Sequence, residues 1–298
     1  MNSIFIRVLV YVFLGTVLFS CSNSDDTFLE PEPTEPTTPT AAINDTLIRD
    51  IAFGTHPLQT YDLYLPENRS AENTKVIVLV HGGGWQSGDK SSMDPFRELI
   101  QKNHPELAVM NVNYVLADED TPAFPNQFND IVAAMSHLEE NAEQFQIQSS
   151  YGMIGTSAGG QLAMLYGFDS QYASKVDMIC TIVGPADFTD PSYTDNAELA
   201  APTFRLLLGP DVPMSEEVLR RYSPIFKIDN MAPPTILFYG KSDPLVPVTQ
   251  AERLKAALDA NSIENELSLY EGGHADWQPQ NFIDVNVKMN AFIRKHMQ

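Results

Sequence analysis

Cysteine and positive charge are both scarce in this sequence. The chain has 2 cysteines among 298 residues, and its 18 Lys and Arg face 39 Asp and Glu, for a formal net charge of −21. Such an excess of negative charge repels nucleic acid and anionic bilayers, so no nucleic-acid partner is expected. The acidity is typical of a protein that must stay soluble after export, and attraction of a cationic substrate is the alternative.

A long apolar run is also missing from the N-terminal segment. The run from Val8 to Phe19 follows Arg7 and is shorter than the roughly 20 residues that span a bilayer. It therefore has the form of a secretory signal. It ends in Leu18-Phe19-Ser20-Cys21, which resembles the lipobox of bacterial lipoproteins, whose Cys becomes a lipid-carrying N-terminus. We predict a signal peptide over 1–20 and a lipid on Cys21; an ordinary signal with a fortuitous Cys, or an uncleaved anchor, is the alternative.

The residues after Cys21 predict a tether and a destination. Ser22 stands where an Asp often retains lipoproteins at the inner membrane, and the acidic stretch 24–28 resembles tags for the outer cell surface. We expect an outer-membrane protein, on either the periplasmic or the surface side. Residues 21–44 are rich in proline, threonine and acid, a composition that favours an extended tether over a packed core. The folded domain is expected over 45–298, and with Cys21 lipidated, Cys180 has no disulfide partner.

Within the folded domain, strand and helix patterns alternate. Strands are expected at 46–53 and 59–65 (as a hairpin), 76–80, 108–112, 151–155, 178–183, 235–239 and 267–270. One helix is expected over 128–145, where the apolar residues form a single stripe, and a second from about 158. A third should begin at a capping box formed by Thr249 and Glu252, and a fourth is expected over 282–293. This alternation predicts an α/β fold with a mostly parallel, doubly wound sheet. Residues 186–232 lack a strong period and are interpreted as a short insertion over the active site.

One glycine-bounded serine stands at a strand-to-helix junction. Gly155-Thr156-Ser157-Ala158-Gly159 matches the G-x-S-x-G pattern of a nucleophile elbow, between an apolar strand and a helix. The turn is so tight that side chains at 155 or 159 would collide with neighbouring backbone. Ser157 is therefore the candidate nucleophile. The amide of Ala158, at the helix N-terminus, can face a developing oxyanion.

A run of three glycines follows the 76–80 strand in His81-Gly82-Gly83-Gly84-Trp85. Glycines bring backbone amides against a substrate without a Cβ in the way, and the segment matches the HGGG type of oxyanion loop. Gly83 and Gly84, with Ala158, are the candidate oxyanion-hole donors. A phosphate-binding loop from Gly83 to Ser91 is a near miss, because Asp89 interrupts the required Gly-Lys pair and would repel phosphate.

The candidate base and acid follow from strand order. His274 is the histidine that falls after the last strand, on the catalytic edge of the sheet. The acid should lie on a loop between the nucleophile and that histidine, and Asp243 follows the 235–239 strand. Asp187 is the competitor, one strand earlier. Asp276 and Asp284 are too close to His274 in sequence to support its ring.

Residues 60–298 resemble the carboxylesterases of the α/β-hydrolase superfamily, near the hormone-sensitive-lipase-like and bacterial feruloyl-esterase-like branches. The resemblance rests on His81–Trp85, Phe124-Pro125, Gly155–Gly160, Ser223-Pro224, Asp243–Pro247 and Gly272–His274. Tyr114-Val115-Leu116-Ala117 departs from the Tyr-Arg-Leu-Ala common in these relatives. The missing Arg is expected to remove a buried ion pair with an acid such as Asp130, which puts the local support of this loop in doubt.

The resemblance implies a serine esterase whose substrate is a small-molecule or polysaccharide-linked ester. Acetyl or feruloyl groups on plant polysaccharide suit a tethered extracellular enzyme. A serine peptidase of the oligopeptidase type and a non-catalytic surface binding lipoprotein are the alternatives. No metal and no cofactor are predicted, because the sequence has no H-E-x-x-H and no His/Cys cluster. Membrane contact is expected through the lipid alone, and the sequence does not indicate the oligomeric state.

Overall fold

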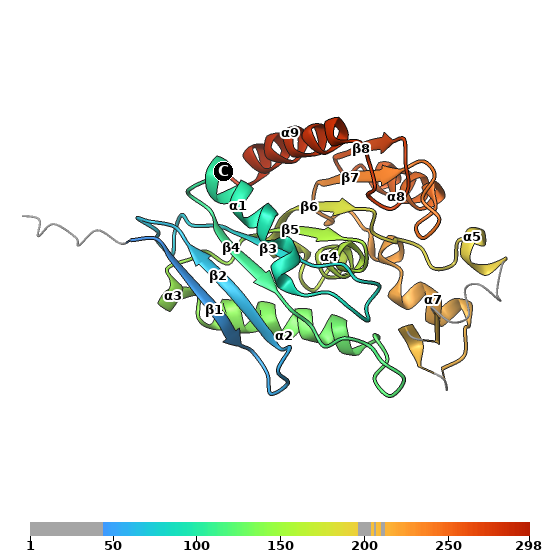
Figure 1. Cartoon of the computed structure of the whole chain (residues 1–298), viewed down its shortest axis with the longest axis horizontal. Helices are drawn as coiled ribbons and strands as arrows, with labels where there is room; N and C mark the ends of the chain where they lie inside the picture. Colours follow the sequence, from blue (N-terminus) through green and yellow to red (C-terminus); the bar gives the residue numbers. More distant parts are fainter. Residues whose placement is uncertain (1–43, 196–203, 206, 210–211) are drawn as a thin grey trace, which may run out of the picture. The chain divides into compact units, whose positions relative to one another are not determined.

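The central feature of the computed structural model is an eight-stranded sheet (Figure 1). Its order is β1-β2-β4-β3-β5-β6-β7-β8; β1 and β2 pair antiparallel with their neighbours, and β3 to β8 are parallel. The strands are β1 Thr46–Ala52, β2 Thr60–Leu65, β3 Val76–Val80, β4 Ala108–Val112, β5 Tyr151–Thr156, β6 Val176–Ile182, β7 Thr235–Gly240 and β8 Asn265–Tyr270. The structure describes residues 44–195, 204–205, 207–209 and 212–298. The predicted α/β class and mostly parallel sheet are confirmed.

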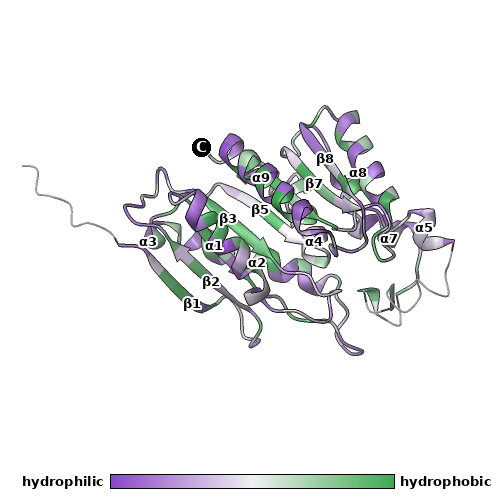
Figure 2. Ribbon diagram, turned by 45° about the horizontal axis from the view of Figure 1, so that its top comes forward, coloured by the Kyte–Doolittle hydropathy of each residue, from purple (hydrophilic) through white to green (hydrophobic). Residues whose placement is uncertain are grey.

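Helices cover both faces of the sheet. One face packs on α1 (Asp94–Asn103) and α9 (Pro279–His296), and the other packs on α2 (Asn126–Glu140), α4 (Ala158–Phe168) and α8 (Val248–Ala260). Strand β3 divides its side chains between the two cores, with Val78 on one side and Leu79 on the other, and both are fully buried. Burying a side chain of this size contributes about 1.5–3 kcal/mol. Figure 2 shows the corresponding colours, with hydrophobic central strands and helices that alternate between hydrophobic and hydrophilic residues.

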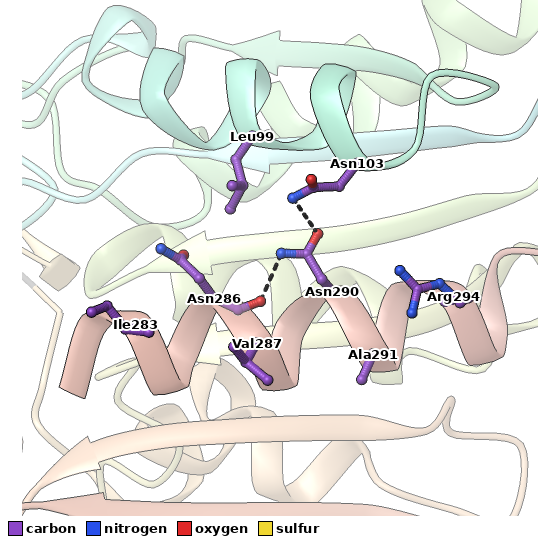
Figure 3. Close-up of a pocket in the computed structure, with 8 residues that line it drawn as sticks. All are labelled: Leu99, Asn103, Ile283, Asn286, Val287, Asn290, Ala291 and Arg294. Atoms are coloured by element: carbon purple, nitrogen blue, oxygen red, sulfur yellow. Dashed lines mark hydrogen bonds between the residues drawn. The ribbon is translucent and has the colours of Figure 1, made fainter. Parts of the chain in front are cut away.

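The two helices on the first face lie side by side. A shallow groove between α1 and α9 is lined by Leu99 and Asn103 from α1 and by Ile283, Val287 and Asn290 among others from α9 (Figure 3). Asn103 donates to Asn290 across it, at 3.2 Å. Within the described part of the chain, no helix is long and apolar enough to cross a bilayer.

Several predicted elements needed correction, among them the last strand, which begins at Asn265 and not at 267. The expected single helix over 128–145 is wrong, because α2 ends at Glu140 and a separate turn, α3 (Ala142–Phe145), follows a non-helical Asn141. The capping box at Thr249 is also wrong. Helix α8 begins at Val248 after Pro247, whose fixed φ suits a helix start, and no side chain caps it. Strand β6 runs over Val176–Ile182 rather than 178–183, since Val183 turns to φ 49°.

The predicted insertion 186–232 has only short elements in its described part. They are α5 (Pro191–Thr194), α7 (Glu216–Tyr222) and the 3₁₀ turn η3 (Pro224–Lys227); the other 3₁₀ turns, η1 (Lys90–Met93) and η2 (Ala173–Lys175), lie outside it. Phe188 packs edge-on against Trp85 at 6.1 Å, and the Tyr193 hydroxyl donates to the Leu245 carbonyl at 3.1 Å. The insertion therefore contacts the loops after β3 and β7. The predicted signal peptide and nearly all of the predicted tether lie outside the described residues.

Candidate active site

Ser157 occupies a tight turn between β5 and α4. Its backbone has φ 51° and ψ −122°, a sparsely populated conformation for a residue with a side chain. The turn closes because two glycines flank it: a Cβ on Gly155 would lie 2.3 Å from the Gly159 carbonyl oxygen, and one on Gly159 would lie 2.2 Å from that of Val80. The Ser157 N–H donates to the Ile182 carbonyl at 2.8 Å. The strained turn is therefore held from the neighbouring strand.

His274 lies on the loop after β8, with its ring next to Ser157. The distance from His274 Nε2 to Ser157 Oγ is 2.8 Å. The loop reaches this position through a close approach to the end of β7, where a Cβ on Gly240 would lie 2.1 Å from the Gly273 carbonyl oxygen. Gly272 has φ 124°, which favours glycine. The geometry gives the serine hydroxyl an acceptor for its proton.

Asp243 completes a chain of hydrogen bonds. Its Oδ2 is 2.7 Å from His274 Nδ1, and its Oδ1 accepts from the N–H groups of Leu245 at 2.8 Å and Val246 at 2.9 Å. The Asp243 side chain is fully buried. Because a carboxylate only accepts, Nδ1 carries the proton and Nε2 is free to accept from Ser157. The structure thus brings together the three residues that the sequence singled out, in the order serine, histidine, acid.

The competing acid, Asp187, forms its hydrogen bonds with residues outside the triad. It is completely buried, and its Oδ2 accepts from Arg253 Nε at 2.7 Å. Its Oδ1 accepts from the N–H and the hydroxyl of Thr189, at 2.8 and 2.6 Å. Beside this pair, Gln250 accepts from the N–H of Asp187 at 2.8 Å and donates to its carbonyl at 2.9 Å. Asp187 therefore anchors the start of the insertion to α8.

The glycine loop after β3 lies directly against the nucleophile. A Cβ on Gly82 would lie 3.2 Å from Ser157 Cβ, and Gly83, Gly84 and Trp85 have φ of 123°, 58° and 64°. The Gly83 carbonyl is turned into the loop, where it accepts from Ser87 N at 3.0 Å. Among the hydrogen bonds of the described residues, the N–H groups of Gly83, Gly84 and Ala158 have no acceptor. These three amides are available to a ligand.

Two glutamines that the sequence reasoning missed hold this loop. Gln127 on α2 donates to the Trp85 carbonyl at 2.6 Å, and Gln161 on α4 accepts from the Trp85 indole at 3.2 Å. Both glutamine side chains are fully buried. For Gln127, the available signal was a polar residue one position before the apolar stripe that begins at Phe128; Gln161 lies within α4, which is buried all round and has no such stripe. The contacts themselves depend on how α2 and α4 pack.

His81, at the start of the loop, has a supporting role. Its ring stacks on Tyr114 at 4.2 Å between centroids, and the Tyr114 hydroxyl donates to the His81 carbonyl at 2.8 Å. Burial lowers the pKa of His81, against the raising effects of its contact with the Gly82 carbonyl and of nearby Asp89. The neutral imidazole is a packing element beneath the loop.

The doubt over the loop at 114–117 is resolved by neutral donors. Asp130 is buried, and its Oδ2 accepts from the Val115 N–H at 2.8 Å. Its Oδ1 accepts from the Gln59 side chain at 2.7 Å. None of the salt bridges among the described residues includes Asp130. The loop nevertheless keeps its support, because Gln59 and the Val115 amide donate to Asp130 in the absence of that Arg.

The remaining predictions concern the two cysteines and metal binding. Cys180 is buried in β6, and burial raises the pKa of its thiol far above the usual range. In the described part of the chain, no group of three or more His, Cys, Asp or Glu side chains is arranged to hold a metal ion. Cys21, the predicted lipid attachment site, lies outside the described residues.

The sheet order and the elbow define the class of this protein. A mostly parallel eight-stranded sheet, with a serine on a strained turn between a central strand and its helix, is the α/β-hydrolase fold. The sequence profile of the BD-FAE family matches residues 61–258. The chain belongs to this family.

The chain is only distantly similar in sequence to individual proteins of known name. The chain is 26% identical over 242 residues to Esterase LipC of Mycobacterium tuberculosis (strain ATCC 25618 / H37Rv), covering 76% of this chain and 59% of LipC. It is 29% identical over 174 residues to Arylacetamide deacetylase of Bos taurus, covering 53% of this chain and 41% of that protein. The chain thus spans about half the length of these curated relatives. A truncated carbohydrate esterase from gut microbiota superposes with a TM-score of 0.70 at 22% identity, covering 87% of this chain and 99% of that one, a likeness of fold.

Proposed function

We propose that this protein is a serine esterase that hydrolyses carboxylic esters through an acyl-enzyme. The observation that carries the proposal is the hydrogen-bonded chain from Ser157 through His274 to Asp243, at 2.8 and 2.7 Å. Distances in this range let a base remove a hydroxyl proton as the oxygen attacks. The esterase names of relatives that share the fold support the same chemistry.

In the proposed mechanism, Ser157 Oγ attacks the ester carbonyl carbon while its proton moves to His274 Nε2. The carbonyl oxygen becomes an oxyanion, which the N–H groups of Gly83, Gly84 and Ala158 bind. Asp243, already bonded to Nδ1, stabilises the imidazolium. When the intermediate collapses, the C–O bond to the alcohol breaks and the proton on Nε2 leaves with the alcohol. A water then repeats these steps on the acyl-enzyme and releases the carboxylic acid.

For the substrate, we propose acetyl or feruloyl esters on plant polysaccharide. The name of the structurally similar carbohydrate esterase supports this class, since that protein shares the fold over most of both chains. We further propose that a lipid on Cys21 holds the enzyme at the outer membrane, with residues 21–44 as a tether. This second proposal rests on the lipobox-like sequence at Leu18–Cys21.

A substrate panel tests the proposal. Wild-type protein and Ser157→Ala are assayed on p-nitrophenyl esters of graded chain length, on acetylated xylan, on methyl ferulate and on a p-nitroanilide peptide. Ester cleavage is expected, and Ser157→Ala should lower it by roughly 10⁴-fold or more. Wild-type rates retained in the pure mutant would overturn the serine mechanism. Cleavage of the anilide in place of esters would support a peptidase.

A further inference from the structure

Both backbone polar groups of Gly273, the residue before His274, are hydrogen-bonded. The Gly273 N–H donates to Asp276 Oδ1 at 2.5 Å. The Gly273 carbonyl accepts from the Trp277 indole at 3.0 Å and from Ala275 N at 2.9 Å. One residue earlier, the Gly272 carbonyl accepts from Ser242 N at 3.0 Å. Ser242 adjoins Asp243, so the backbones that carry the histidine and the acid are also tied to each other.

We propose that Trp277 is a positioning residue for His274. Among the hydrogen bonds of the described residues, its side chain forms none with Ser157, Asp243 or His274; its indole N–H holds the Gly273 carbonyl, which adjoins His274 in the backbone. An indole nitrogen only donates, so this contact has one possible direction. The proposal rests on the role proposed for His274, and it adds a residue that the elbow, the oxyanion loop and the triad leave unexplained.

The indole of Trp277 is held in place by its own packing, so it can fix the position of the carbonyl to which it donates. Trp277 is 5% exposed and packs against Tyr270 at 4.7 Å and Phe282 at 5.7 Å between ring centroids. It belongs to the core between the sheet and α9. A buried donor packed against two rings can hold a loop in place, whereas an exposed side chain would move with it.

The loop needs such support because its backbone is unusual. Gly272 has φ 124° and Ala275 has φ 58°, a left-handed conformation that costs a residue with a Cβ about 1–2 kcal/mol. Without the indole, the Gly273 carbonyl keeps only the Ala275 N–H within its own turn. The imidazole would then sample positions away from Ser157, and a displacement of about 1 Å can lower a rate by up to 10²-fold.

The test compares variants of two neighbouring aromatic residues, Trp277 and Tyr270. Trp277→Phe keeps a ring and removes the donor to Gly273. Tyr270→Phe is the matched control, because its hydroxyl donates to Asp284 at 2.7 Å, away from the histidine loop. We expect kcat on a short p-nitrophenyl ester to fall about 3- to 30-fold in Trp277→Phe with KM within twofold, and Tyr270→Phe to keep wild-type kcat. Equal melting temperatures of Trp277→Phe and Tyr270→Phe would show that a difference in kcat between them does not come from a difference in stability.

A conservative pair at Asp276 adds a rescue. Asp276→Asn keeps an oxygen for the Gly273 N–H and should retain most of kcat, whereas Asp276→Ala should lower kcat several-fold. Wild-type kcat in Trp277→Phe would overturn the proposal, whatever Asp276→Ala does, while leaving the esterase function intact.

A spectroscopic readout covers the case in which the wild type cleaves no ester. The His274 Nδ1–H proton, bonded to Asp243, should give a low-field proton NMR signal, assigned by its loss in His274→Ala. Broadening or loss of this signal in Trp277→Phe, with the signal intact in Tyr270→Phe, supports positioning whatever the reaction is. An unchanged signal in both variants refutes it.

Discussion

Replacing Asp243 by Asn tests the central feature of the site, because the structure determines which way the amide must point. Oδ1 accepts two backbone N–H groups, from Leu245 and Val246, and an NH₂ group cannot replace it there. The amide oxygen therefore stays at Oδ1, and the NH₂ group faces His274 Nδ1 from 2.7 Å. Two donors then oppose each other, so the imidazole must move its proton from Nδ1 to Nε2.

The wrong tautomer removes the base. With a proton on Nε2, His274 cannot accept from the Ser157 hydroxyl, while the fold and the amides of the oxyanion loop stay in place. A comparable change in a serine protease lowers kcat by about 10⁴-fold. At 1.36 kcal/mol for each factor of ten, this is a loss of about 5 kcal/mol of transition-state stabilisation.

Asp187→Asn is the matched comparison, since Asp187 is equally buried and was the rival candidate. Its NH₂ group would face the Arg253 guanidinium, so stability should fall. The Arg253 side chain is 42% exposed and can turn to water, which keeps the cost below the ~3–5 kcal/mol of a fully buried pair, at about 1–3 kcal/mol. We expect a melting temperature lower by roughly 3–10 °C and a kcat within about tenfold of wild type.

Both variants are assayed on p-nitrophenyl acetate well below their melting temperatures, with circular dichroism to check the fold. The expected result separates the two carboxylates: one variant is inactive and stable, and the other is active and less stable. If Asp187→Asn abolished turnover in folded protein while Asp243→Asn remained active, the assignment of the acid would be refuted.

Two further predictions concern the anchor and the response to pH. Cys21→Ser should move the protein from the membrane fraction to the soluble fraction at unchanged specific activity, and wild-type mass should exceed that of the polypeptide beginning at Cys21; a wild type starting elsewhere without added mass would refute lipidation. Burial lowers the pKa of His104, although its bond to Asn290 and nearby Glu106 act in the opposite direction. The unfolded chain therefore binds more protons below pH about 6.5, and folding stability should fall as pH drops through that range. Urea unfolding from pH 7.5 to 5 should show a shallower decline in His104→Gln than in wild type and in the exposed control His56→Asn; identical slopes in all three would contradict the prediction.

Much of the fold could be predicted because its signals are local. The central strands β3 and β4 are buried on both faces, so Val76–Val80 and Ala108–Val112 are mostly apolar runs, and their predicted bounds are exact. The predicted helix boundaries were less accurate than those of these two strands. The apolar stripe over 128–145 continues through Asn141, where the chain leaves the helical conformation, because periodicity reports the buried face and not the backbone between α2 and α3.

The supports of the site could not be predicted, and the reason is the separation of the partners. Gln161 meets Trp85 across 76 positions, and Arg253 meets Asp187 across 66. The sequence shows that each residue is present, but these pairs follow from how helices pack on the sheet. Trp277 and Gly273 are only four positions apart, and yet their contact forms across a turn with a left-handed Ala275, which the residue pattern does not indicate.

The sequence by itself determined which residues this protein has for chemistry and on which loops they lie. A glycine-flanked serine, a glycine run, an aspartate and a histidine each follow a strand, and parallel strands bring their carboxyl ends to one edge. The tertiary structure alone decided the distances of 2.7 and 2.8 Å in the Asp243–His274–Ser157 chain and the assignment of Asp187 to Arg253. The donor–acceptor distance of a hydrogen bond can vary by only a few tenths of an ångström, and only the packed helices and loops fix side chains that closely.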